Sequence, residues 1–489
     1  MAYIGGEVAQ KQEKFMFPTS NQPRRVINVF VLALLNVSIM LSLRTLPLVA
    51  EFGLSCLFFF VMAALFFLLP CALVSAELAT GWIKSGGVYI WIREALGDRW
   101  GFFSIWMQWV HNIAWYPVIL SFIATTLAYI AFPELTNNKW YVVSVILVSF
   151  WGMTLLNYLG IKTSSFFSSI GVMIGTIIPG IFIISLGFSW VASGHPLQIT
   201  LSADALLPDL SEMGNLVFLA GLFLAFSGLE VSSSLAGEIK DPQKNYPRAI
   251  ILAAIITFTV LVLGAMSIAI IIPPNQISLV GGLMEAFEKF LPIYHLEWLI
   301  PVLGTLLIIG AVAEINAWLI SPIKGLHSTS VHGNLPPFFQ NLNSHGTPTH
   351  LLLFQAIIVS ITSMVFLFMP SISSGFWILT ALSAQSYLIM YIFLFISAVR
   401  LRYTKPHVPR VYRIPYPHKG IWIASCMGIA SALFAISIGF IPPKELHIMD
   451  TRFYVSFLVV GLIIMCGIPL LIYACRKPHW ITRQQVKKK

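Results

Sequence analysis

Long apolar stretches alternate with short polar segments along the whole chain. A membrane-spanning helix needs roughly 20 mostly apolar residues to cross a hydrocarbon core about 30 Å thick. The pattern predicts an all-α integral membrane protein with twelve transmembrane helices. The first follows a polar segment and no small-residue cleavage site comes after it, so we expect a retained helix rather than a signal peptide. The twelve stretches lie at approximately 26–50, 54–78, 99–131, 140–158, 165–190, 214–236, 247–272, 297–320, 349–369, 373–399, 418–440 and 452–475.

The composition agrees with this pattern. Hydrophobic residues make up 57% of the 489 residues and charged residues only 10%, which is far from the composition of an ordinary soluble domain. The five cysteines lie in or at the ends of apolar stretches without CxxC spacing, so we expect small hydrophobic side chains rather than a disulfide or metal framework. No HExxH, GxSxG or Walker A motif occurs. We therefore expect no enzymatic activity, no metal and no cofactor.

Basic residues are distributed unevenly among the polar segments. If the N-terminus is cytoplasmic, 24 of the 29 Lys and Arg residues fall on cytoplasmic segments, the side on which basic residues of short loops are retained. We therefore predict a multi-pass protein of the bacterial inner membrane with both termini in the cytoplasm. The same asymmetry accounts for the formal net charge of +10 without a nucleic-acid partner; membrane lipid is the expected partner, and the sequence leaves the oligomeric state open.

Two glutamates, Glu230 and Glu314, lie in the middle of apolar stretches. Ionisable groups inside a membrane cost a few kcal/mol or more and mark functional sites. A buried carboxyl can carry a proton at mildly acid pH, so Glu314 is a candidate for proton or substrate sensing; the alternative is a hydrogen bond between helices. For Glu230, gating and a purely structural role are both open. His111 is a third candidate for gating or proton sensing, with ordinary packing as its alternative.

The first and sixth stretches each contain residues that interrupt a membrane helix. Residues 38–47 include two serines, an arginine, a threonine and Pro47, and residues 227–234 include a glycine and four serines around Glu230. Proline removes a backbone hydrogen bond, and interrupted helices at corresponding positions of two halves indicate a transporter site built from inverted repeats. Helix N-termini suit a carboxylate and exposed carbonyls suit an ammonium, so the pattern favours an amino acid as the small-molecule substrate.

The stretches differ in character along the chain, which suggests a division into segments. Ten helices carry the interruptions and polar residues, whereas the last two are plain apolar rods after a basic loop. We expect a ten-helix transport core with two repeats, followed by two accessory helices. The predicted segments are the cytoplasmic N-terminal segment 1–25, the core 26–400 with repeats at about 26–190 and 214–400, the basic loop 401–417, the accessory helices 418–475 and the short tail 476–489.

Several motifs, in order along the chain, carry a family resemblance. The segment 75–106, with Ala76-Glu77-Leu78-Ala79 and Ser85-Gly86-Gly87-Val88-Tyr89, and the segment 226–249 resemble the amino acid/polyamine/organocation superfamily. Ala313-Glu314-Ile315 with Trp318, Asn334-Leu335-Pro336-Pro337 and Gly346-Thr347-Pro348 look like its bacterial glutamate/gamma-aminobutyrate (GABA) antiporter branch. The similarity covers essentially all twelve stretches.

The resemblance implies a LeuT-type five-plus-five inverted repeat with broken helices 1 and 6, which exchanges an amino acid for its decarboxylated product. It also implies roles for individual residues, with Glu230 and Glu314 at the acidic positions of the family. Ser38 and Arg44 flank or follow the first break and join the candidate set. The candidate substrate-binding residues are Ser38, Met40, Leu41, Ser42, Arg44, Ala225, Phe226, Ser227, Trp318, Tyr387 and Tyr391.

Two departures from the family pattern matter. Met40-Leu41-Ser42 replaces the usual Gly-Ser-Gly-like break, and Arg44 follows two residues later. Arg44 could bind a substrate carboxylate or neutralise Glu51, Glu230 or Glu314; the sequence leaves both readings open. The second departure is the tail, which is shorter than the C-terminal plug of the antiporter branch, so pH gating would need another device.

We expect a secondary active antiporter that exchanges a glutamate-like amino acid for a GABA-like product or another amino acid. The alternatives are a proton-coupled amino acid or polyamine permease of the same superfamily and a passive channel. Two further expectations concern single residues. Glu77, at the end of the second stretch, should pair with a nearby Lys or Arg as structural support, and Trp115 and Tyr116 should lie at the membrane interface.

Overall fold

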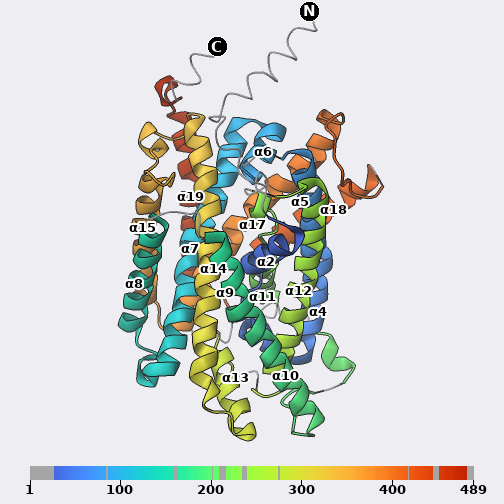
Figure 1. Cartoon of the computed structure of the whole chain (residues 1–489), viewed down its shortest axis with the longest axis vertical. Coiled ribbons are helices and arrows are strands. Elements are labelled where there is room, and N and C mark those ends of the chain that lie inside the picture. The colour runs from blue at the N-terminus through green and yellow to red at the C-terminus, as the bar shows by residue number, and fades with distance from the viewer. Residues whose placement is uncertain are drawn as a thin grey trace, which may run out of the picture.

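The computed structural model describes residues 27–83, 86–158, 164–200, 202–208, 216–233, 239–273, 276–416, 418–443 and 451–481. Within these ranges the protein is all-helical, and the only pairing of extended backbone is an isolated bridge between Ile27 and Ile239. The long helices run side by side as one bundle (Figure 1). The described part contains 11 helices long and apolar enough to cross a membrane. The protein is therefore a multi-pass membrane protein.

The first half of the core follows the predicted order of helices. A short helix, α6 (Val88–Leu96), lies between the second and third spans at one end of the bundle. The five spans are α2 (Val29–Met40) with α3 (Leu46–Ala50), α4 (Cys56–Ala63) with α5 (Leu69–Gly81), α7 (Asp98–Ala131), α8 (Lys139–Tyr158), and α9 (Ser164–Val172) with α10 (Ile178–Ala192).

The second half also contains a short helix, α13 (Gly282–Phe290), which lies at the end of the bundle opposite α6 (Figure 1). Its members are α11 (Phe218–Ala225), α12 (Pro242–Ala269), α14 (Leu299–Val331), α15 (Thr349–Ser363) with α16 (Val365–Phe368), and α17 (Ile372–Thr404), followed by α18 (Lys419–Ile438) and α19 (Thr451–Ala474).

Two boundaries differ from the sequence prediction. The helix expected at 297–320 continues to Val331. The prediction ended too early because the last turns of this helix are polar and fall outside an apolar window. The helix α14 packs against α7. Among the described residues of the stretch expected at 214–236, the α-helix is the eight-residue α11, after which residues 226–230 are not helical. Residues 209–215 and 234–238 lie outside the described ranges, so the count of twelve spans stays a prediction.

The second and fifth spans each change to a single turn of π-helix before a proline. The segments η3 (Ala64–Leu68) and η6 (Met173–Ile177) precede Pro70 and Pro179, each at the second position of the next helix. Proline is tolerated there because the first N–H groups of a helix have no intrahelical partner. The Ser431 hydroxyl of α18 donates to the Phe66 carbonyl in the second span at 3.0 Å. This hydrogen bond ties α18 to the second span.

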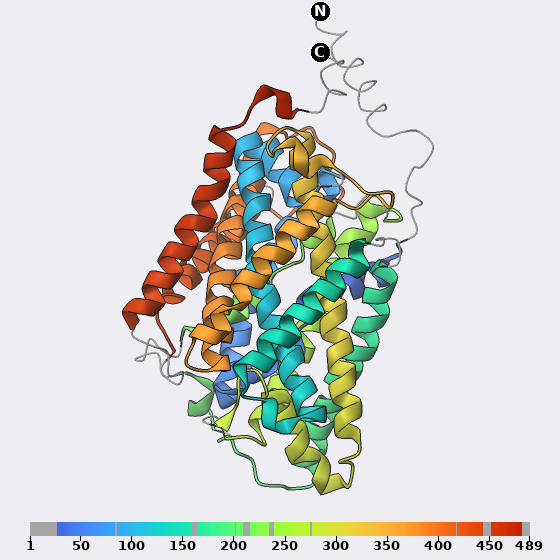
Figure 2. The same ribbon diagram turned by 90° about the vertical axis from the view of Figure 1, so that its left-hand side faces the viewer.

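The centre of the bundle is α7, which packs against both α14 and α17. Of the most apolar part of α7, 83% is buried, compared with 11% for α19. Figure 2 shows α19 along the outer margin of the bundle, where it packs against α7 and α17. A helix that exposes almost all of its apolar surface is suited to face lipid, whereas α7 is placed to carry a site inside the bundle.

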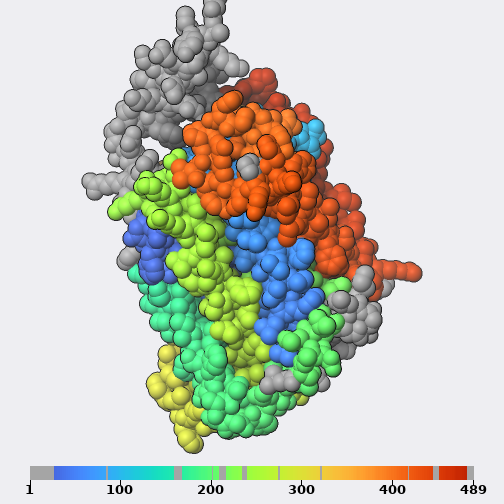
Figure 3. Space-filling model, turned by 90° about the vertical axis from the view of Figure 1, so that its right-hand side faces the viewer, coloured from blue at the N-terminus to red at the C-terminus, as the bar shows by residue number. Residues whose placement is uncertain are grey.

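Polar segments far apart in sequence meet at one end of the molecule. Arg402 of α17 pairs with Glu77 of α5, Lys405 pairs with Glu94 of α6, and the Gln340 side chain donates to the Trp480 carbonyl at 2.6 Å. Figure 3 shows the segment that joins α17 to α18 covering this end next to α12 and α5. The predicted pairing of Glu77 with a nearby Lys or Arg is thus confirmed.

Candidate functional site

The first span is interrupted where the polar residues predicted it. The helix α2 ends at Met40, and Leu41 and Ser42 are extended, with φ/ψ of −83°/102° and −115°/113°. A short 3₁₀ turn, η1 (Leu43–Thr45), then leads into α3, where Pro47 occupies the second position. The break places the side chains of η1 inside the bundle, because all three of its residues are buried.

The sixth span is interrupted at the corresponding place in the second half. After α11 ends at Ala225, residues 226–230 are not helical, and Gly228 has a φ of +108°. A Cβ atom on Gly228 would lie 2.7 Å from a methyl carbon of Ile39 and 3.1 Å from the Trp318 ring. Glycine is therefore required both by the backbone conformation and by the close approach of the two breaks.

A cavity lies between the two breaks. It is bounded by the two breaks together with α7, α14 and α17. Among the predicted site residues, eight line it: Met40, Ser42, Arg44, His111, Ala225, Ser227, Glu314 and Trp318. The structure thus brings most of the candidates, from four separate segments, into one place.

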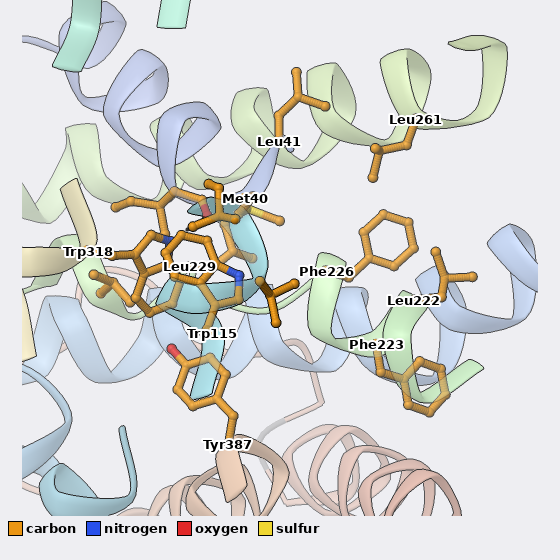
Figure 4. Packing of buried hydrophobic residues seen from close by; sticks show 14 of the residues in the cluster. Met40, Leu41, Trp115, Leu222, Phe223, Phe226, Leu229, Leu261, Trp318 and Tyr387 are labelled. Atoms are coloured by element: carbon orange, nitrogen blue, oxygen red, sulfur yellow. Dashed lines mark hydrogen bonds between the residues drawn. The ribbon is translucent and has the colours of Figure 1, made fainter. Parts of the chain in front are cut away.

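The other predicted site residues do not line this cavity. Leu41 and Phe226 point away from it in Figure 4, and the Phe226 ring packs against Phe60 and Phe258. Ser38 is buried within α2. Tyr387, Tyr391 and Glu230 form a separate cluster beside the cavity.

Arg44 and Glu314 are the two charged residues of the cavity wall. Their exposed fractions are 7% and 6%, and their opposite charges act on each other. The Arg44 guanidinium carbon lies 5.6 Å from the centre of the Trp115 ring and 5.8 Å from that of Phe376, distances at which a cation is attracted to aromatic rings. Ser42 lines the same cavity. Of the two glutamates inside the spans, Glu314 is therefore the one beside Arg44.

Trp318 joins the eighth span to the first break. Its indole N–H donates to the carbonyl of Ile39 at 3.0 Å, next to the end of α2. In Figure 4 the Trp318 and Trp115 rings gather with Met40 near Leu229, and the Tyr387 hydroxyl points toward this group. The indole therefore closes one side of the cavity and contacts both interrupted helices.

Glu230 is bound by tyrosines of α17. Its carboxylate accepts hydrogen bonds from the hydroxyls of Tyr387 and Tyr391, the latter at 2.5 Å, and from Gln108 at 3.3 Å. The Tyr391 oxygen also accepts the Gly228 N–H at 2.7 Å. Arg44 therefore has no role in holding Glu230, which instead fixes the sixth-span break against α17.

His111 connects the cavity wall to this tyrosine cluster. Its Nδ1 lies 2.7 Å from the Ser383 hydroxyl, and its ring stacks on Tyr387 with centres 4.2 Å apart. Its Nε2 makes no hydrogen bond to any residue in the described part of the chain. His111 thus both lines the cavity and packs against the tyrosine cluster.

Several cavity residues were missed from the sequence. Trp115, expected at the membrane interface, is 3% exposed and lines the cavity, so that prediction was wrong. It lies four residues after His111 and therefore on the same face of α7. Phe376 and Thr380 precede Ser383 and Tyr387 at helical spacing on α17, so the periodicity of α17 could have indicated them.

The described residues contain no group of three or more His, Cys, Asp or Glu side chains that could hold a metal ion. Among the described residues, the site is thus a pocket of aromatic, aliphatic and small side chains with one cation and one anion. Such a pocket can bind a small molecule that carries both charges.

A model of the amino acid permease family matches residues 27–464. The chain belongs to this family. The resemblance to the amino acid/polyamine/organocation superfamily is thereby confirmed. Its relatives are transporters, so the permease has a transport role rather than an enzymatic one.

Individual relatives align with most of the permease. It is 41% identical to an uncharacterized transporter of Legionella pneumophila over 92% of this chain and 97% of the relative. It is 30% identical to the glutamate/gamma-aminobutyrate antiporter of Lactococcus lactis over 92% of this chain and 90% of that protein. It is 25% identical to the probable agmatine/putrescine antiporter of Lactococcus lactis over 75% of this chain and 77% of that protein.

Proposed function

We propose that this permease is a secondary active antiporter that exchanges a glutamate-like amino acid for a GABA-like decarboxylation product or another amino acid. The observation that carries the proposal is the cavity where the two interrupted helices meet, with Arg44 and Glu314 in its wall. A zwitterionic substrate supplies a partner for each of these charges. The named Lactococcus antiporter, at 30% identity, supports the same substrate class.

In this proposal, transport occurs by alternating access through a LeuT-type five-plus-five inverted repeat. Repeat one spans about 26–190 and repeat two about 214–400, with the last two helices as accessory elements. The interrupted pair, α2 with α3 and α11 with the residues after it, rocks against the remaining core. The Trp318 hydrogen bond to Ile39 and the Tyr391 contact with Gly228 are the contacts that such a movement must change.

Exchange can be measured directly in proteoliposomes that contain the purified protein. Vesicles preloaded with glutamate, GABA or no amino acid are placed in labelled glutamate, and uptake is followed at several pH values. We expect uptake only when a counter-substrate is inside. Equal uptake into empty vesicles would contradict exchange. If that uptake requires an acid-outside pH gradient, it indicates proton symport; if it carries an ohmic current, it indicates a channel.

The second candidate function is a polyamine permease of the same family, which the agmatine/putrescine relative favours. A competition panel of glutamate, glutamine, GABA, arginine and agmatine distinguishes the two. We expect glutamate and GABA to compete with labelled glutamate and agmatine to have no effect. Strong competition by agmatine with none by GABA would favour the polyamine function.

A further inference from the structure

Arg44 is the feature of the cavity that the general exchange mechanism leaves unexplained. Its guanidinium is inside the bundle, between the rings of Trp115 on α7 and Phe376 on α17. Its Nε makes no hydrogen bond to any residue in the described part of the chain. A buried donor without a partner costs free energy. The protein carries this cost before substrate binds, so a ligand that accepts a hydrogen bond from this nitrogen removes it.

Stability does not account for the two opposite charges, Arg44 and Glu314, in the cavity wall. Buried charges are weak evidence for stability, because apolar residues of similar volume often replace them at no cost. Charged residues inside a membrane face cavities and mark substrate or ion pathways. Both side chains line the cavity, and the Arg44 side chain comes from the residues that follow the first-span break.

We propose that Arg44 binds the one carboxylate that an acidic amino acid and its decarboxylation product have in common, while Glu314 takes the ammonium group of the same molecule. This inference rests on the proposed exchange function and specifies how one site accepts both exchange partners. Decarboxylation of glutamate removes the α-carboxylate and leaves the side-chain carboxylate and the nitrogen in place. Only these two groups are available in both directions of the exchange.

The geometry of the arginine suits this role. A guanidinium presents the N–H groups of its Nε edge in a plane that matches the two oxygens of a carboxylate. Trp115 and Phe376 contact the guanidinium, which restricts its orientation, and the unpaired Nε lies on the edge that a carboxylate uses. A diamine would instead bring a second cation next to Arg44. The site therefore excludes putrescine-like substrates in two ways. Arg44 repels the second ammonium group, and this group offers no hydrogen-bond acceptor to the Arg44 Nε.

The test compares pairs of competitors that differ in this one carboxylate. Glutamine is the neutral isostere of glutamate, and putrescine replaces the carboxylate of GABA by an amine at similar chain length. Half-inhibitory concentrations against labelled glutamate are measured in proteoliposomes for the unmodified protein, Arg44→Gln and Arg44→Lys. Arg99→Gln is the control, because Arg99 is an exposed arginine at the start of α7, remote from the cavity lining.

The unmodified protein should prefer glutamate over glutamine by about 10-fold or more, the value of a charged hydrogen-bonded pair. We expect Arg44→Gln to reduce this preference to about 3-fold or less, with an intermediate value for Arg44→Lys and no change for Arg99→Gln. Putrescine should compete only in Arg44→Gln. Because each preference is a ratio within one variant, a lower amount of folded protein does not alter it.

Three outcomes separate the inference from the proposed function. If the unmodified protein does not exchange glutamate, the proposed function fails. If it exchanges glutamate and both Arg44 variants keep the full preference over glutamine, only the assignment of Arg44 fails. If Arg44→Gln does not fold, Arg44→Lys decides, since an unchanged preference in that variant overturns the inference and a reduced preference supports it.

Discussion

At the scale of single residues, the two buried glutamates have different surroundings. Glu314 lines the cavity next to Arg44, whereas Glu230 lies beside it, bound by two tyrosines and Gln108. A residue that contacts substrate affects both affinity and rate. A residue that holds a helix break affects chiefly the rate of the conformational change. The two positions should therefore respond differently to the same isosteric substitution.

Glu314→Gln removes the only carboxylate among the described residues that line the cavity. We expect slower exchange and a flatter dependence of the remaining rate on pH between about 5 and 8, because the amide neither gains nor loses a proton. Initial rates in proteoliposomes at matched internal and external pH measure this effect. The control is Glu134→Gln, since Glu134 is exposed in the loop between α7 and α8. A pH profile identical to that of the unmodified protein would exclude Glu314 from proton sensing.

Glu230→Gln keeps the size of the side chain but weakens the hydrogen bonds with Tyr387 and Tyr391, because the carboxylate accepts both charge-assisted bonds. We expect the maximal exchange rate to fall about 10-fold or more with less than a 3-fold change in KM. Kinetics over a range of external glutamate separate the two parameters. A large rise in KM at unchanged maximal rate would instead indicate that Glu230 binds substrate.

At the scale of helices, Glu77 joins three elements at one end of the bundle. Its carboxylate accepts hydrogen bonds from Arg402 of α17, from Arg410 at 3.3 Å and from the backbone N–H of Ile414 at 2.9 Å. The Glu77 and Arg402 side chains are 3% and 6% exposed. Nearby, Glu94 and Lys405 form a second ion pair, with side chains 30% and 37% exposed. The two pairs provide a matched comparison of buried and half-exposed charge.

We expect Glu77→Gln to destabilise the protein by about 3–5 kcal/mol, because it leaves two buried arginines with a neutral partner. Glu94→Gln should cost no more than about 1 kcal/mol, the range of exposed pairs. Thermal unfolding in detergent, followed by loss of the monodisperse peak, measures the difference. Equal melting temperatures for the two variants would mean that Glu77 contributes no more than a surface charge.

The fifth and eighth spans approach each other at two glycines. A Cβ atom on Gly175 would lie 2.1 Å from the backbone nitrogen of Gly310, and a Cβ on Gly310 would lie 2.4 Å from the Gly175 carbonyl oxygen. Both obstacles are backbone atoms, so a methyl group must move a helix. Small residues at helix contacts in membranes permit this close packing.

Gly175→Ala should therefore lower the melting temperature and the exchange rate together, since α14 carries Glu314 and Trp318. We expect a loss of about 1–3 kcal/mol, as for overpacked cores. Gly152→Ala on α8 is the control, because nothing lies within 4 Å of its added Cβ. Equal melting temperatures and exchange rates for Gly175→Ala and Gly152→Ala would contradict the close packing of the fifth and eighth spans.

The sequence predicted the elements better than it predicted the site. Hydropathy alone indicated the spans, and Pro47 and the serines near it indicated the first break, because helix formation and membrane burial are local properties. The division between cavity residues and support residues was not predictable. Tyr387 and Trp318 both looked like site aromatics, yet Tyr387 binds Glu230 and only Trp318 lines the cavity. That distinction depends on how α7, α14 and α17 pack together.

At the scale of the whole molecule, the polar segments at the α6 end set the expected orientation. They include the region of α6, the segment from α17 to α18 and the residues after α19, all of which carry Lys or Arg. Basic residues of short loops remain on the cytoplasmic side. The opposite end carries the loop between α7 and α8 and the short helix α13 (Figure 1). The α6 end should therefore face the cytoplasm.

The native cysteines provide the means to test this orientation. Cys475 is exposed directly after α19, at the α6 end, while Cys56 and Cys71 are buried within the second span. In a variant that keeps only Cys475, a membrane-impermeant maleimide should label inverted membrane vesicles and not intact cells. Asn137→Cys, in the loop between α7 and α8 of an otherwise cysteine-free variant, should show the opposite pattern, because that loop lies at the far end of the bundle. Labelling of Cys475 in intact cells would place the basic end outside and contradict the predicted topology. The same two variants can also be labelled with and without glutamate. Because the cavity lies between the two labelled ends, labelling at each end is the reference against which the alternating-access movement is measured.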